Sequence, residues 1–140
     1  MQPARRGGVV TRRIRAISAT SEAIEAALAA AAAIDDKKGL DVVLLDVSEL
    51  LVVTDVFVIA SGTSNRHVRT LSDEAEAWLF ERLGRKPLRR EGRDYSTWIL
   101  LDYGDMVVHV FDQETRDYYQ LERLWADAPA IEFEPTPSEA

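Results

Sequence analysis

The chain has no cysteine among its 140 residues, so neither a disulfide framework nor a thiolate metal site can form. This absence suits a reducing compartment, and we expect a cytoplasmic protein. The longest mostly apolar runs, such as residues 52–60, are too short to cross a bilayer as a helix, so we expect no membrane partner. A chain of this length fits one domain with a single hydrophobic core.

Histidine is scarce as well, because His67 and His109 are the only two. No short spacing joins them. A two-histidine metal site assisted by Asp46 or Asp55 is geometrically possible. The simpler interpretation places His67 at a helix start and His109, hydrogen-bonded, within a strand. We therefore expect no metal.

The familiar sequence patterns of active sites are missing too. Residues 62–64 form a turn that could hold a phosphate, but the turn lacks the lysine of a P-loop and the spaced glycines of a dinucleotide site. Asp73 and Glu74 are adjacent within a predicted helix, so they cannot hold one metal as alternating strand carboxylates would. Asp102 and Asp105 flank a turn, where aspartate is ordinary. We expect no catalytic residue, no cofactor and no enzymatic activity.

Charge is unevenly distributed along the chain. The formal net charge is −7, yet residues 1–15 contain five arginines and no acid. This leader could be a presequence, a nucleic-acid-binding arm or a disordered extension, and we expect residues 1–19 to be disordered. The acidic remainder repels phosphate over most of its surface, which favours a protein partner, including a basic one.

Three amphipathic helices are predicted, at residues 21–36, 65–83 and 113–124. Each begins at residues that can cap open amides, namely Thr20 or Ser21, Ser64 or Asn65, and Asp112. The alanine run of the first helix permits close packing on a sheet. Its expected inner face consists of Ile24, Ala27, Leu28, Ala31 and Ile34.

Five strands are predicted between these helices. They lie at residues 41–47, 56–61, 87–91, 97–101 and 106–111, and the last two form a hairpin about residues 103–104. Continuous apolar strands imply that helices cover both sheet faces. The expected fold is α/β (α+β), a mixed sheet flanked by helices in the order α-β-β-α-β-β-β-α. We place the domain at residues 20–126 and an irregular, acidic, proline-containing tail at residues 127–140.

Two surfaces could bind a partner. Alternation along residues 97–101 puts Trp98 and Leu100 on one sheet face, and three modest helices can leave that face incompletely covered. Trp98 is then either an interface anchor or a core residue. The basic cluster of the body either protects a sheet edge or contacts RNA or an acidic surface, and it consists of Arg85, Lys86, Arg89, Arg90 and Arg93.

Several ordered motifs between residues 21 and 125 resemble the ribosomal silencing factor family, also called RsfS or Iojap. The matching stretches are Asp46-Val47, Thr54-Asp55, Ser61-Gly62-Thr63-Ser64, Arg66-His67-Val68, Glu91-Gly92, Trp98-Ile99-Leu100-Leu101-Asp102, Gly104-Asp105, Val108-His109-Val110, Arg116, Tyr119 and Leu121-Glu122-Arg123-Leu124-Trp125. Val56 stands where the family often has a cysteine.

The resemblance implies a nucleotidyltransferase-like fold without the transferase carboxylates. It also implies a homodimer that binds the large ribosomal subunit, at its fourteenth protein on the intersubunit face, and so blocks joining with the small subunit and represses translation when nutrients run short. By matched position the leading contact residues are Trp98 and Tyr119. Neighbourhood alone adds Asp105, Met106 and Arg116.

Two alternatives stay open at this point. One is a divergent magnesium-dependent nucleotidyltransferase that uses Asp46, Asp55 or Asp102. The other is an RNA-binding module that uses residues 85–93 and the basic leader, and the same residues could make a minor ribosomal RNA contact within the first hypothesis.

Overall fold

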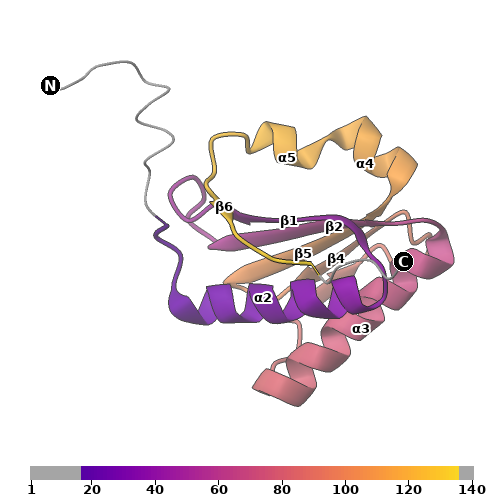
Figure 1. Cartoon of the computed structure of the whole chain (residues 1–140), viewed down its shortest axis with the longest axis horizontal. Helices are drawn as coiled ribbons and strands as arrows, with labels where there is room; N and C mark the ends of the chain where they lie inside the picture. The colour runs from indigo at the N-terminus through magenta and orange to yellow at the C-terminus, as the bar shows by residue number, and fades with distance from the viewer. Residues whose placement is uncertain (1–16, 136–140) are drawn as a thin grey trace, which may run out of the picture.

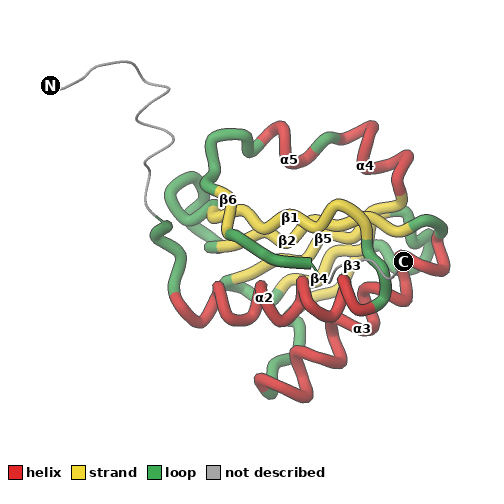
Figure 2. Tube along the Cα trace, viewed as in Figure 1, coloured by secondary structure: helices red, strands yellow, loops and turns green. Residues whose placement is uncertain are grey.

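A computed structural model describes residues 17–135 as a mixed six-stranded sheet between two layers of helices (Figures 1 and 2). The helices are α2 (Ser21–Asp36), α3 (Asn65–Leu83), α4 (Gln113–Tyr119) and α5 (Leu121–Leu124). The strands are β1 (Leu40–Asp46), β2 (Val56–Gly62), β3 (Arg89–Glu91), β4 (Trp98–Asp102), β5 (Met106–Asp112) and β6 (Ala130–Ile131). None of the helices in the described residues is long and apolar enough to span a membrane.

The sheet has the order β3-β4-β5-β2-β1-β6. Only β2 and β5 pair in parallel, and the other neighbours are antiparallel. β2 and β5 are central and almost wholly buried, which confirms the prediction from their continuous apolar sequences. β3 is exposed along its length and lies at one edge, as its charged sequence indicated.

One face of the sheet packs against α2 and α3 (Figure 1). The predicted bounds and caps of both helices are confirmed, with Thr20 accepting from the Ala23 amide and Ser64 from the His67 amide. Six alanines of α2 are fully buried, so the small side chains let the helix approach the sheet closely. Leu28 was placed on this inner face wrongly, because it lies on the outer side of α2 and is exposed.

The other face carries α4 and α5 (Figure 1). The single helix predicted for residues 113–124 is wrong in one respect, because Gln120 adopts a left-handed conformation with φ of +48° and divides it. The turn lets Leu121 and Trp125 reach the sheet, where Trp125 meets Phe57 edge to face at 5.8 Å. These two short helices cover only part of this face.

Both ends of the predicted domain need correction. The segment described as an irregular tail contains β6, which pairs with β1, and Phe133 packs against the α2 side of the core. At the other end, most of the predicted leader lies outside the described residues. Its last part is held, because the Asp46 carboxylate accepts the amides of Ser18 at 2.7 Å and Ala19 at 3.0 Å.

Candidate functional site

Trp98 and Tyr119 lie together on the partly covered sheet face. Trp98 starts β4, Tyr119 ends α4, and their ring centroids are 5.0 Å apart. Trp98 also packs on Phe111 at 4.7 Å, and it is half-buried, whereas Tyr119 is 54% exposed. Two large aromatic side chains with remaining exposed surface form an amphipathic contact of the kind found at protein interfaces. We call this pair the aromatic patch.

His109, on the neighbouring strand β5, fixes the orientation of Trp98 through a hydrogen bond. The indole N–H of Trp98 donates to Nδ1 of His109 at 3.2 Å, across the β4–β5 ladder. Burial lowers the pKa of His109 to about 4, so the imidazole is neutral at physiological pH and can accept this bond. The expectation that His109 is a hydrogen-bonded strand residue is confirmed. The expected role of His67 is confirmed too, because its Nδ1 accepts the Thr63 amide at the start of α3.

Arg116 positions the aromatic patch but has little free surface of its own. Its guanidinium donates to Ser61 Oγ at 2.9 Å and to the Glu122 carboxylate at 2.8 Å. Burial opposes the ionisation of Glu122, but the hydrogen bonds from Arg116 hold its pKa below the usual range. Since Arg116 is buried in α4 and Glu122 belongs to α5, the pair ties both short helices to β2.

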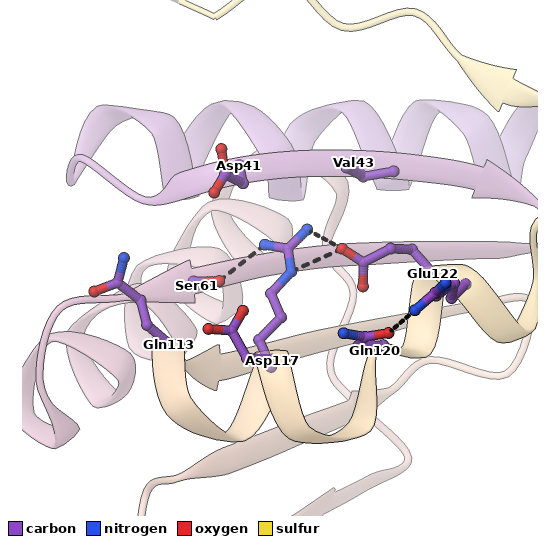
Figure 3. Close-up of a pocket in the computed structure, with 9 residues that line it drawn as sticks. Asp41, Val43, Ser61, Gln113, Asp117, Gln120 and Glu122 are labelled. Carbon is purple, nitrogen blue, oxygen red and sulfur yellow. Dashed lines mark hydrogen bonds and ion pairs between the residues drawn. The ribbon is translucent and has the colours of Figure 1, made fainter.

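A cleft of about 500 Å³ lies beside this Arg116–Glu122 pair, between α4, α5 and the start of β1 (Figure 3). Ser61 and Glu122 point into it, and both are already bonded to Arg116 (Figure 3). Asp41 and Asp117 add negative charge at its mouth. Ser61 and Glu122 are both bonded to Arg116, so these side chains brace the short helices α4 and α5 against the sheet.

Two of the predicted contact residues are not part of the aromatic patch. Met106 is fully buried on the opposite face, against the α2 layer, because β-strand alternation turns it away from Trp98. It cannot touch a partner, so naming it as a contact was wrong. Asp105 lies at the hairpin, where its carboxylate binds Arg85 at 2.8 Å. Trp98 lies opposite Phe111, six residues along the chain from Asp105, which is roughly 20 Å at about 3.4 Å per strand residue.

Of the three aspartates considered for transferase chemistry, Asp46 and Asp55 accept from adjacent backbone amides, but Asp102 lies apart from both. Asp46 accepts from Ser18, Ala19 and Ser48, while Asp55 accepts from the Thr20 amide. Asp102 lies three strands away from β1, which is roughly 14 Å at about 4.8 Å per strand. Among residues 17–135 there is no cluster of three side chains arranged to hold a metal ion.

The basic cluster is largely neutralised within the chain. Four of its arginines form ion pairs with carboxylates of the same protein, namely Arg85 with Asp105, Arg89 with Asp102 and Glu91, Arg90 with Glu76, and Arg93 with Asp73. These pairs tie the edge strand and its flanking loop to α3 and to the hairpin. The arrangement agrees with edge protection and leaves little unpaired positive charge for RNA.

One surface was missed by the sequence analysis. Beside the aromatic patch, over parts of β2, β3, β4 and β5, runs an apolar groove of about 460 Å³ whose walls include Val53, Leu88 and Leu100. Val53 and Leu88 are highly exposed. Their only sequence signal is that each is an apolar residue in a connecting segment, next to Thr54 and Arg89 respectively.

Comparison with known proteins gives a consistent result. The family described as "Ribosomal silencing factor during starvation" matches residues 20–140. The ribosomal silencing factor RsfS of Bacillus subtilis is 41% identical over 105 residues, which cover 75% of this chain and 88% of the relative. A mouse protein named "Mitochondrial assembly of ribosomal large subunit protein 1" is 36% identical over 87 residues, covering 61% of this chain and 38% of its own.

The fold comparison agrees with the sequence comparison. A crystal structure of a Chromobacterium violaceum protein superposes with a TM-score of 0.72 at 36% identity, and the match covers 84% of this chain and 92% of that one. A sequence identity of 36% over most of both chains is too high for two unrelated proteins that merely share a common architecture. The chain therefore belongs to the ribosomal silencing factor family.

Proposed function

We propose that this protein binds the large ribosomal subunit, at its fourteenth protein, and sterically blocks joining with the small subunit. Translation would then be repressed under nutrient limitation or in stationary phase. The family's name supports a ribosomal silencing role, and the name of the mouse relative refers to the large subunit. The observation that carries the proposal for this chain is the aromatic patch, where the tilted rings of Trp98 and Tyr119 meet on an incompletely covered sheet face.

The proposed mechanism is steric and needs no chemical step. About 800 Å² of buried surface per partner is a standard contact, and a domain of this size can supply it on one face. The net charge of −7 favours a basic ribosomal protein, which would raise the association rate and make it sensitive to salt. Because the arginines of residues 85–93 are paired internally, a ribosomal RNA contact there would be a minor addition.

Sedimentation with isolated large subunits tests the binding step. The protein should pellet with large subunits at low salt, and adding it before small subunits should reduce the yield of joined ribosomes. A purified, folded protein that never sediments with large subunits would remove the proposal. The resemblance also implies a homodimer, which analytical ultracentrifugation of the free protein would test.

Two neighbouring tyrosines provide a matched test of the aromatic patch. Tyr119→Ala removes the ring that contacts Trp98, whereas Tyr118→Ala removes a ring that is 80% exposed and meets the ring of Tyr119. Tyr119→Ala should weaken large-subunit binding by about 1–2 kcal/mol, and Tyr118→Ala by much less. Trp98→Ala should weaken binding by about 2 kcal/mol or more with the fold retained. Equal binding by both tyrosine variants and the wild type would move the contact to another face.

A further inference from the structure

The apolar groove beside the aromatic patch contains two polar atoms that have nothing to bind. Its floor and walls include Phe57, Leu100, Val107 and His109, and its rim includes Val53, Thr54 and Leu88. Within residues 17–135, neither Nε2 of His109 nor Oγ1 of Thr54 has a hydrogen-bond partner, although both atoms are buried. Buried polar atoms without partners are uncommon and costly, so two of them along one groove call for a physical reason.

The proton on His109 can be assigned from its neighbours. Nδ1 accepts the indole N–H of Trp98, so the neutral ring carries its proton on Nε2. Trp98 does not line the groove, whereas His109 does. Because Nδ1 is bonded to Trp98, which lies outside the groove, we place the buried Nε2–H on the groove side of the ring. The result is a hydrogen-bond donor beneath an apolar surface with no acceptor.

The surroundings indicate what could occupy the groove. The walls are aliphatic and aromatic, which suits an apolar side chain. Arg89 and Asp102 also line the groove, but they pair with each other at 3.2 Å, and Arg89 also pairs with Glu91 at 3.2 Å, so the groove offers no free charge to a phosphate. A nucleic-acid backbone is therefore a poor match, and a protein segment is a good one.

We propose that the apolar groove receives an apolar side chain from a protein of the large ribosomal subunit, and that Nε2–H of His109 donates a hydrogen bond to a carbonyl oxygen beside that side chain. This inference rests on the proposed function and adds a polar specificity contact to it. Nε2 is buried in the free protein, so a covering side chain must shift on binding, as interface side chains commonly do. Binding then supplies the acceptor that the free protein lacks.

Two conservative substitutions at His109 separate this role from simple support of Trp98. In His109→Asn the amide oxygen replaces Nδ1 and still accepts from Trp98, but the donor at the Nε2 position is lost. In His109→Gln the amide N–H reaches the Nε2 position, but the acceptor for Trp98 is lost. We expect His109→Asn to bind large subunits about tenfold more weakly than the wild type and His109→Gln to bind within about threefold. Chemical denaturation should confirm that both variants are folded.

The opposite order would contradict the inference. If His109→Asn binds like the wild type while His109→Gln binds weakly, His109 acts only by holding Trp98. If both variants bind large subunits as strongly as the wild type does, the groove contact would also be rejected, while the proposed function would remain intact. A wild-type protein that does not bind large subunits at all would reject the proposed function itself, and the two failures are therefore distinguishable.

Adjacent valines test occupancy of the groove without touching its floor. Val53 and Val52 are 80% and 101% exposed, but only Val53 lines the groove. An aspartate at either position costs little folding free energy because both side chains are already in water. Val53→Asp should weaken large-subunit binding at least tenfold, and Val52→Asp should change it less than about twofold. Equal effects of the two variants would show that the groove is empty in the complex.

Discussion

Arg116 and Glu122 join two consecutive short helices through a charged hydrogen bond of 2.8 Å, and the same guanidinium reaches Ser61 in β2. One side chain thus connects α4, α5 and the sheet. Since α4 ends at Tyr119, the connection holds the aromatic patch in place. Arg116 matches the family motif, but its side chain is buried and supports the fold. Its effect on large-subunit binding should therefore be indirect.

Replacing Arg116 by alanine should destabilise the protein by about 2–3 kcal/mol, because a buried acceptor and a partly buried carboxylate lose their donor. Arg123→Ala is the matched control, since Arg123 is exposed and its guanidinium donates to the side chain of Gln120. Its free energy of unfolding should stay within about 0.5 kcal/mol of wild type. Urea denaturation measures both. Equal stability of the two variants would mean that α4 and α5 do not depend on the Arg116 contacts.

Gly92 lies against the backbone of Trp98. Its φ is +90°, and a Cβ atom there would stand 1.9 Å from the carbonyl oxygen of Trp98. Gly92→Ala should therefore cost well over 1 kcal/mol and shift the fluorescence of the tryptophans, because the start of β4 must move. Gly84→Ala is the comparison, since Gly84 has φ of +66° with open space around it. It should cost about 1 kcal/mol, from backbone strain alone.

His109 should make the folded protein sensitive to mild acid. Its pKa is lowered by burial from 6.5 to about 4 in the folded state. Below pH 6.5 the unfolded chain takes up a proton that the folded protein does not. The free energy of unfolding therefore decreases as the pH is lowered, until the folded pKa is reached. The loss between pH 6.5 and 4 should be about 3 kcal/mol, from about 1.4 kcal/mol per unit. Guanidinium denaturation of wild type and His109→Asn across this range should show a smaller loss in the variant.

The internally paired arginines lead to a prediction about salt. If Arg89, Arg90 and Arg93 contacted ribosomal RNA phosphates, replacing all three by alanine would lower the slope of log affinity against log salt by roughly 2–3. Because each is paired with a carboxylate of the same chain, we expect a change below about 1. Binding to large subunits at several potassium concentrations measures the slope. A large drop would restore RNA as a main partner.

Much of the fold could be predicted from local sequence. Ser64 and Gly84 bracket α3 because a side-chain cap and a left-handed glycine terminate helices whatever surrounds them. Gly104, with φ of +89°, supports the turn between β4 and β5 for the same kind of reason. Errors arose where distant contacts decide. Gln120 has no strong turn preference, yet it breaks the last helix so that Leu121 and Trp125 can reach the sheet.

The candidate site shows the same division. Trp98 and Tyr119 could be chosen by residue type and by resemblance, and they do meet. Met106 was chosen by neighbourhood and lies on the opposite face, because one residue of displacement along a strand reverses the side-chain direction. The apolar groove could not be predicted, since its walls come from four strands and three connecting segments that lie far apart in the sequence.

The sequence by itself determined the first two helices, five of the strands, the hairpin and the family, because capping, periodicity and ordered motifs are local properties of the chain. Only the tertiary structure decided that β6 closes the sheet against β1, that four arginines are neutralised by their own carboxylates, and that His109 keeps an unpaired donor beside an open groove. These features depend on which residues lie opposite one another across the sheet. That pairing is set by packing the whole chain and not by any one segment.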